Sequence, residues 1–291
     1  MEAIISHAFE FLKQKQNPDG SWGTADQVGT TALALLAYLG RCETPESPFY
    51  GETILKALLF LIQKGRKNAD GILASDIASA HAAAEHGLAT HALGEMYLAA
   101  RYGSKSLPGL REAFEKDLKV IINQQRPTGG WGGQAGKAGY SVAGSGSPFV
   151  TVWQCEALAT AKRSGLKIEG LSNSIDKATA FILTLQQAEG GFSSETTESP
   201  AAITGACLRV LQILHSNHTE KMARGYDHSR KHYKNEPFNW GRADLFSCLF
   251  DTLAFHQAGG DYWRSWNFQL LPEVFANCKP KSVNGKDDRL P

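Results

Sequence analysis

The sequence predicts an all-α protein, an α/α toroid of about five to six helical hairpins. Three observations carry this prediction: a recurring turn that joins glutamine, glycine and an aromatic residue, an alternation of half-polar helices with almost wholly apolar ones, and the lack of alternating strand patterns. The chain has 291 residues, of which 42% are hydrophobic, with 30 Lys and Arg against 29 Asp and Glu. It can therefore bury a large core, and it carries no excess of charge that would suit a nucleic acid.

The repeating unit is marked by five turns. Each follows an amphipathic segment, begins with glutamine or asparagine and ends in an aromatic or apolar residue; the turns span residues 16–22, 68–73, 125–131, 187–192 and 235–240. Their last residues are 51, 58, 61 and 48 positions apart. This spacing is the length of one helix pair, so we expect one hairpin for each turn.

The helix before each turn has apolar residues at i, i+3 and i+4 and charges on its other face, as in half-exposed helices. The helix after each turn is apolar or small nearly all round, as in helices buried on both sides. The first class comprises residues 3–14, 52–63, 110–123, 174–187, 218–233 and a last, unpaired 262–277. The second comprises residues 29–39, 77–100, 148–163, 201–215 and 243–257.

Pairs of this kind cannot bury their faces alone, so they stack into a curved array that about six pairs would close into a ring. We expect one domain over residues 1–278, with repeats at about 1–42, 50–101, 109–165, 172–216 and 218–259 and a partial repeat at 261–278, followed by a polar tail at 279–291. This count predicts a ring with a gap, or one whose edge is covered by the tail, a second copy or another protein.

The cellular context follows from what the sequence lacks. No apolar stretch approaches the roughly 20 residues that span a bilayer, and the N-terminus does not read as a secretory leader. The five cysteines are scattered, without a CxxC pair. We therefore expect a cytoplasmic protein with reduced, mostly buried thiols.

The turns resemble those of a known superfamily. Gln16 with Gly20 and Trp22 resembles the QW motif of the squalene–hopene cyclases, and residues 129–133 resemble the Gly-Gly-aromatic turns of protein prenyltransferase β subunits. The resemblance covers nearly the whole chain. It implies an α/α toroid that binds an isoprenoid-like molecule in its centre.

Three further segments, at residues 86–97, 151–154 and 259–267, look like the single-ring, squalene-cyclase-repeat proteins of planctomycete-type and verrucomicrobial bacteria. That group has no settled activity. The resemblance therefore implies a bacterial protein of this superfamily without implying a reaction.

The chain departs from the catalytic motifs of these families. It has no Asp-x-Asp-Asp, the acid motif of class II terpene cyclases, and its one Asp-Asp pair is Asp287–Asp288 in the tail. Cys207 and Cys248 lack the Asp two residues earlier that zinc-binding prenyltransferases use. We predict no cofactor and no metal ligands. A zinc-dependent prenyltransferase-β-like subunit stays an alternative.

Two histidine–glutamate pairs bear on the zinc alternative. His81 with Glu85 and His91 with Glu95 stand four residues apart and could share a metal on one helical face. A capping or hydrogen-bonded histidine is the simpler interpretation of both pairs.

Aligning the inner helices at equivalent hydroxyls predicts which side chains share a level. With Thr31, Thr90, Thr151, Thr204 and Ser247 in register, the fifth following positions are Leu36, Glu95, Glu156, Arg209 and Thr252, which adjoins Asp251. Charges among apolar helices must be paired. They form either a salt-bridge network that fixes the repeats or a central pocket, whose candidate catalytic acids are Glu95, Glu156 and Asp251.

The remaining candidates are ligand-binding. Phe149 and Trp153 lie on an inner helix, and Tyr140 lies in a glycine-rich loop at 132–146 that could close the inner mouth. To these we add Arg209 and three histidines of the inner helices, which are His86, His91 and His256.

The expected function is binding, and as a further option transformation, of an apolar isoprenoid-like ligand in the central cavity. The alternative is a non-catalytic scaffold that binds a protein or peptide. The expected partners are an apolar small molecule and, at the incomplete sixth repeat, a second copy or another protein; no nucleic acid is expected.

Overall fold

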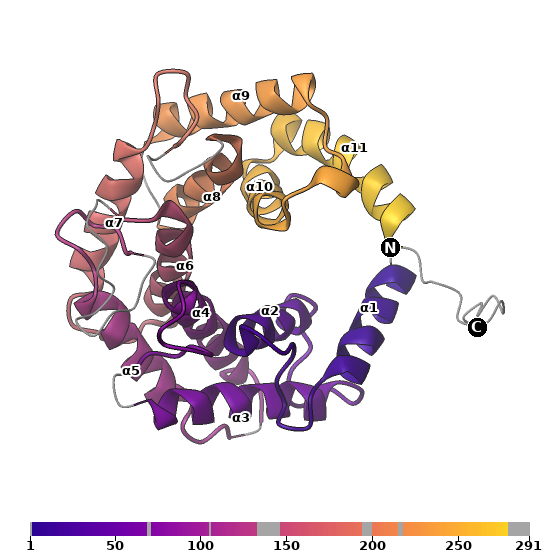
Figure 1. Ribbon diagram of the computed structural model, residues 1–291, viewed down its shortest axis with the longest axis vertical. Helices are drawn as coiled ribbons and strands as arrows, with labels where there is room; N and C mark the ends of the chain where they lie inside the picture. Colours follow the sequence, from indigo (N-terminus) through magenta and orange to yellow (C-terminus); the bar gives the residue numbers. More distant parts are fainter. Residues whose placement is uncertain are drawn as a thin grey trace.

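A computed structural model describes residues 2–68, 71–104, 106–132, 146–193, 200–214 and 218–278, without the side chains of residues 200–202. Over these residues the chain forms eleven α-helices and no strand beyond one isolated bridge between Gln186 and Phe192. The helices alternate between an outer and an inner ring (Figure 1). The predicted all-α toroid is thereby confirmed.

The helix bounds follow the sequence pattern closely. The outer helices are α1 (Glu2–Lys15), α3 (Gly51–Lys67), α5 (Leu110–Asn123), α7 (Leu171–Thr184), α9 (Thr219–Asn235) and α11 (Gly260–Asn277). The inner helices are α2 (Gln27–Leu39), α4 (Ala82–Ala100), α6 (Pro148–Ser164), α8 (Pro200–Ile213) and α10 (Leu245–Ala258), and a 3₁₀ turn, η1 (Trp240–Arg242), precedes α10.

The largest difference in bounds is at the start of α4, which begins five residues later than predicted. Asp76 and Ser79 accept hydrogen bonds from the backbone N–H groups of Ala78 and His81, respectively, and thereby hold residues 76–81 in turns. Short polar side chains that bond nearby backbone compete in this way with helix formation.

The five inner helices are parallel. α4 meets α6 first where Gln154 Nε2 donates to the Ala83 carbonyl, and then further along both helices where His91 contacts Thr160. α8 meets α10 in the same sense, since Gly205 faces Asp251 and Arg209 bonds Gln257. α2 runs in the same sense as α4, because Asp26 meets His81 and Gly29 meets Glu85. α6 runs in the same sense as α10, because Phe149 meets Phe246 and Trp153 meets Phe250. All five inner helices therefore present their C-terminal ends to the same face of the ring.

In the first, third and fourth repeats, a glutamine at the turn ties its hairpin to the next outer helix. Gln16 Nε2 donates to the carbonyls of Gly20 in its own turn and Thr53 in α3, at 3.0 and 2.9 Å. Gln125 makes the equivalent pair of bonds in its own turn and to α7, and Gln186 makes it in its own turn and to α9. The turn glutamines therefore act as joints between consecutive repeats.

The turn aromatics are fixed by hydrogen bonds as well as by burial. Trp22 Nε1 donates to the Leu12 carbonyl at 2.7 Å, and Trp131 Nε1 donates to that of Ile121 at 2.8 Å. Both indoles are buried against the end of the preceding outer helix, as expected for an aromatic ring whose N–H needs a partner inside the core.

The register of the inner helices is defined by the side chain that accepts a hydrogen bond from the backbone N–H of the last turn residue. The backbone N–H groups of Trp22, Trp131 and Phe192 donate to the hydroxyls of Thr31, Thr151 and Thr204, as the predicted alignment requires; in the second repeat the Leu73 N–H donates instead to His86 Nδ1. The expected register at Thr90 is therefore wrong by one turn. His91, five residues after His86, stands at the level of Leu36, Glu156 and Arg209, and Glu95 lies one turn further along.

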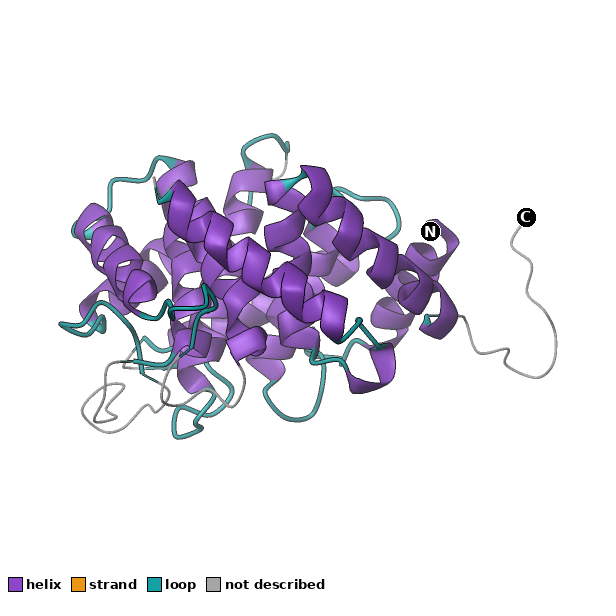
Figure 2. Cartoon of the chain, turned by 90° about the horizontal axis from the view of Figure 1, so that it is seen from above, coloured by secondary structure: helices purple, strands orange, loops and turns teal. Residues whose placement is uncertain are grey.

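The ring is open. In Figure 1 the outer ring runs from α1 round to α11, whereas among the described helices no sixth inner helix stands between α10 and α2. Viewed from the side, the ring is flatter than it is wide (Figure 2). One continuous core, from Phe9 to Leu270, fills the space between the two layers. Over the described residues no helix is long and apolar enough to cross a membrane.

Candidate functional site: the central cavity

A cavity of about 670 Å³ lies inside the inner ring. Each of the five inner helices contributes to its wall, so the cavity exists only because the hairpins curve around a common axis. The wall comprises Leu33, Leu36, Ala37 and Leu39 of α2 with its C-cap Gly40, His91 and Glu95 of α4, Trp153, Glu156, Ala159 and Arg163 of α6, Arg209, Gln212 and Ile213 of α8, and Leu249, Phe250, Leu253 and Gln257 of α10.

The cavity is apolar where the inner helices begin. Trp153 and Phe250 meet edge to face, with ring centroids 5.0 Å apart, and Phe246 packs on Phe250 at 4.7 Å. Phe149, in the first turn of α6, covers Phe246 at 4.6 Å. These four rings, which we call the aromatic floor, join α6 to α10 across the intervening α8.

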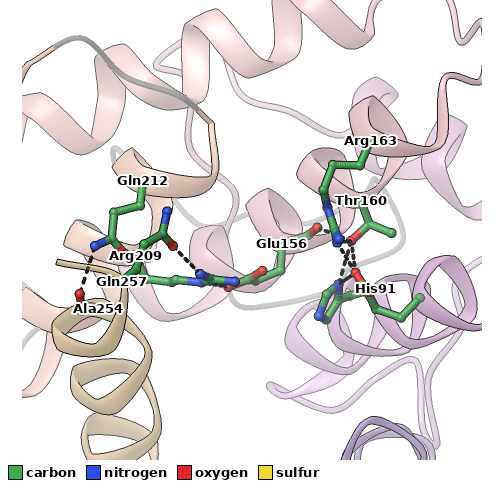
Figure 3. A network of polar contacts seen from close by, with 9 residues as sticks. His91, Glu156, Thr160, Arg163, Arg209, Gln212, Ala254 and Gln257 are labelled. Atoms are coloured by element: carbon green, nitrogen blue, oxygen red, sulfur yellow. Dashed lines mark hydrogen bonds and ion pairs between the residues drawn. The ribbon is translucent and has the colours of Figure 1, made fainter. Parts of the chain in front are cut away.

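The wall between α4 and α6 is polar (Figure 3). His91 Nδ1 lies 2.9 Å from the hydroxyl of Thr160, and that hydroxyl lies 2.8 Å from Glu95 Oε1. Arg163 forms an ion pair with the same Glu95 oxygen. Because Glu156, Thr160 and Arg163 follow Trp153 at positions i+3, i+7 and i+10, one face of α6 carries both the aromatic floor and this network.

A second polar group joins α6, α8 and α10. Arg209 Nε donates to Glu156 Oε1 at 3.0 Å, and Arg209 Nη1 donates to Gln257 Oε1 at 2.7 Å (Figure 3). About one turn further along α8, Gln212 Nε2 donates to the Ala254 carbonyl at 2.9 Å. Only 5% of the Glu156 side chain is exposed, against 22% for Arg209, so the arginine offsets the cost of burying the acid.

These contacts limit the chemistry that the cavity offers. Glu95 and Glu156 each accept hydrogen bonds from a guanidinium, and an ion-paired carboxylate has no proton to donate. The same contacts link neighbouring inner helices, as expected of a salt-bridge network that fixes the repeats. The arrangement therefore suits the binding of a ligand better than its protonation.

Five of the ten predicted site residues line the cavity: Glu95, Glu156, His91, Trp153 and Arg209. Phe149 lies outside the lining, as does its neighbour Phe246, and 42% of Phe149 is exposed. Tyr140 and most of the glycine-rich loop, residues 133–145, lie outside the described residues.

His86 is a structural histidine and not a cavity residue. Nδ1 accepts from the Leu73 N–H at 2.9 Å, so the ring proton lies on Nε2, which donates to the Asp117 carbonyl at 3.2 Å. Complete burial lowers the pKa of His86 to about 4, which keeps the imidazole neutral. In the second repeat, His86 thus takes the position that a threonine has in the first, third and fourth repeats.

Asp251 faces away from the cavity, into the contact of α10 with α8 and α9. The Tyr233 hydroxyl donates to Asp251 Oδ2, whereas Oδ1 is buried against Gly205 without a hydrogen-bond partner. Burial raises the pKa of Asp251 to about 7, against the lowering effect of the Tyr233 bond. This acid, which holds a proton more readily than an ordinary aspartate, is therefore out of reach of a ligand in the cavity.

His256 also lies outside the lining, although it is on the inner helix α10. Its side chain is exposed and meets the indole of Trp263 in α11 edge to face, with ring centroids 5.0 Å apart. This contact braces the last two helices of the ring against each other.

The two predicted histidine–glutamate pairs have other partners. Glu85 accepts from the Gly29 N–H at 2.8 Å and from Ser75, and His81 lies 3.1 Å from Asp26. His91 Nδ1 lies 3.7 Å from Glu95 Oε1, and the two side chains also contact Thr160 and Arg163, respectively. In the described part of the chain no three His, Cys, Asp or Glu side chains are grouped as metal ligands.

Three polar residues of the wall were missed from the sequence, namely Arg163, Gln212 and Gln257, and so was the buried Thr160 that bonds His91 and Glu95. A detectable signal existed for α6, because Arg163 stands seven residues after Glu156 and thus on the same helical face. For Gln212 and Gln257 nothing in the sequence distinguished them from exposed polar residues near a helix end.

No protein-family model matches the sequence, and no curated protein matches it significantly. Among solved structures, the chain is similar to the type II terpene cyclase MstE from Scytonema, determined in complex with its substrate geranylgeranyl dihydroxybenzoate. The two chains are 18% identical with a TM-score of 0.49, and the similar region covers 85% of this chain and 62% of the cyclase chain. This chain thus spans less than two thirds of the cyclase structure, and the similarity concerns the helical fold alone.

Proposed function

We propose that the protein binds an apolar, isoprenoid-like molecule in its central cavity, with the hydrocarbon part on the aromatic floor. The observation that carries this proposal is the division of the cavity into an apolar end at Trp153 and Phe250 and a polar end at Arg163 and Gln257. Small-molecule sites have volumes of roughly 300–1,000 Å³ and are mainly apolar with a few placed polar groups. The cavity, at about 670 Å³, agrees with both properties.

The α2 side of the cavity supports the same proposal. Leu33, Leu36, Ala37 and Leu39 form a purely alkyl wall opposite the charged face of α6. Such a wall gains free energy by covering a hydrocarbon chain, at about 25 cal/mol for each Å² removed from water. It offers nothing to a polar metabolite of the same volume.

The test is native mass spectrometry of the protein with farnesol, comparing two matched Leu→Trp variants. Leu36→Trp fills the cavity from α2, whereas Leu59→Trp makes the same chemical change on the exposed face of α3, where Leu59 is 44% exposed. We expect Leu36→Trp to lose about tenfold or more of the affinity and Leu59→Trp to retain it. Circular dichroism checks that both variants fold. Equal binding in the two variants contradicts the proposal.

A non-catalytic scaffold that binds a protein is a second candidate, favoured by one surface. On α11, which has no inner partner after it among the described residues, Phe268 is 82% exposed and Phe275 41% exposed. Exposed aromatic side chains of this size commonly belong to interaction surfaces when they gather in a patch. Sedimentation of the protein and of its Phe268→Asp variant distinguishes the candidates: a self-association that the variant abolishes supports the scaffold.

A further inference from the structure

The chemistry of the polar end specifies the head group of the ligand. We propose, resting on the proposed function above, that the cavity accepts an apolar molecule with an uncharged polar head, such as an alcohol, and discriminates against the corresponding phosphate or carboxylate. The head lies at the C-terminal ends of the inner helices and the hydrocarbon chain on the aromatic floor. Three observations support this inference.

The first is the balance of charge in the lining. Four charged side chains line the cavity, and they form two pairs, Glu95 with Arg163 and Glu156 with Arg209. Both guanidinium groups thus already face a carboxylate. An anionic head group would have to displace one of these carboxylates or lie beside it, and like charges at such distances repel.

The second is the direction of the inner helices. Because all five are parallel, the negative ends of their dipoles meet at the polar end of the cavity. Residues from the last turns or caps of α2, α6, α8 and α10 line it there, namely Gly40, Arg163, Ile213 and Gln257. Phosphate sites on helices use the opposite, N-terminal ends. In this ring those ends surround the aromatic floor.

The third is the presence of neutral hydrogen-bonding groups at the same level. The imidazole of His91 and the carboxamide of Gln257 line the cavity on opposite sides of the two ion pairs. A hydroxyl both donates and accepts, so it can bond an amide, an imidazole or a paired carboxylate without displacing an ion pair. A diphosphate can use only the donors.

The experiment compares farnesol with farnesyl diphosphate, which share one hydrocarbon chain, by equilibrium binding to the full chain. We expect the diphosphate to bind about tenfold more weakly or worse. The decisive variant is Glu156→Gln, which leaves Arg209 without its carboxylate. We expect the ratio of diphosphate affinity to farnesol affinity to rise about tenfold or more in this variant.

Two controls separate charge from folding. Glu156→Gln/Arg209→Gln restores neutrality and should lose the gain in the affinity ratio, and Glu52→Gln, which breaks an exposed pair with Lys56 on α3, should change neither ligand. Tighter binding of the diphosphate than of farnesol by the unaltered protein, or no rise of the affinity ratio in Glu156→Gln, overturns the inference and leaves the proposed function standing. Binding of neither probe overturns both.

Discussion

Helix α8 contacts a buried acid on each of its two sides, and the two acids have opposite environments. On the side towards α6, Glu156 meets a guanidinium, and the resulting pair faces the cavity. On the side towards α10, Asp251 meets only the hydroxyl of Tyr233 and lies against Gly205. The first acid is paired with a cation beside a space where a ligand can lie. The second is driven towards its neutral form in a contact that is closed.

The difference teaches how to separate a binding wall from a packing contact. A charge is retained where a second charge and some solvent reach it, and it is suppressed where helices approach closely. A raised pKa in this molecule therefore marks tight packing more than it marks a reactive group. Asp117, whose pKa burial raises to about 8 in the outer layer, agrees with this interpretation.

The largest effect is expected from removing one partner of the α6–α8 pair. Arg209→Leu leaves Glu156 buried without a cation and should lower the free energy of unfolding by about 3–5 kcal/mol. In the double variant Glu156→Leu/Arg209→Leu most of that loss should be recovered, because no charge is left unpaired. Urea unfolding at pH 7 measures both. If the double variant is as unstable as the single one, the loss of stability does not come from leaving Glu156 without a cation, and the prediction is wrong.

The second prediction concerns the pH dependence that Asp251 introduces. Because its pKa rises from 3.8 unfolded to about 7 folded, the folded state holds the extra proton between these values, and stability falls as the pH rises from about 4 to 7. Asp251→Asn keeps an acceptor for Tyr233 and removes this titration. At pH 8 it should be more stable than the unaltered protein by about 2–4 kcal/mol, and near pH 4 the two should agree.

Only the difference between variant and unaltered protein is diagnostic here. His86, whose folded pKa is lowered to about 4, acts in the opposite direction: it costs stability as the pH falls below about 6.5. A difference in unfolding free energy that is constant from pH 4 to 8 would show that Asp251 does not titrate in this range.

The third prediction tests the closed α8–α10 contact directly. A Cβ added at Gly205 would lie 2.0 Å from Asp251 Oδ1 and 2.8 Å from its backbone nitrogen. Gly205→Ala should therefore destabilise the protein by about 2–3 kcal/mol. Gly40→Ala, at the end of α2, meets only ordinary contacts at 3.4 Å or more and is the matched control. Thermal unfolding of the two variants gives the comparison, and equal stabilities would contradict the close approach.

The smallest effect is expected at the joints between repeats. Gln16→Ala removes two hydrogen bonds, to Gly20 and Thr53, and should cost about 1–2 kcal/mol. Gln14→Ala, two residues earlier on the exposed side of α1, should cost less than about 0.5 kcal/mol. Similar losses from both changes, measured by urea unfolding, would mean that the joint adds nothing beyond helix propensity.

The fold could be predicted from sequence because it depends on local patterns repeated several times. Three independent patterns predict the same hairpin: the residue types of the turns, the period of the apolar residues, and the spacing of Trp22, Trp131 and Phe192. Together they predicted both ends of ten of the eleven helices to within a few residues. Only α4 began late. There the side chains of Asp76 and Ser79 outweighed an apolar pattern that continued through Ile77.

The site was less predictable because it depends on rotation about each helix axis. The alignment through hydroxyls failed in the second repeat, where His86 takes the threonine's place and Glu95 is shifted by a turn. It also failed in the fifth repeat, where the Trp240 N–H donates to Glu273 and not to Ser247. Asp251 was placed near the axis because it adjoins Thr252, yet one residue is about 100° of rotation on a helix. Distinguishing a cavity acid from a contact acid requires the neighbouring helix, which a sequence alone does not supply.

The turn glutamines have a consequence for how such a ring can change over time. Each joint uses a side chain on one repeat and only backbone carbonyls on the next, so the receiving repeat needs no particular residue. A hairpin can then be duplicated, lost or replaced without a matching change in its neighbour. The number of hairpins in the ring can therefore change one hairpin at a time. The residues that line the central cavity can change independently, as long as the turn glutamines are kept.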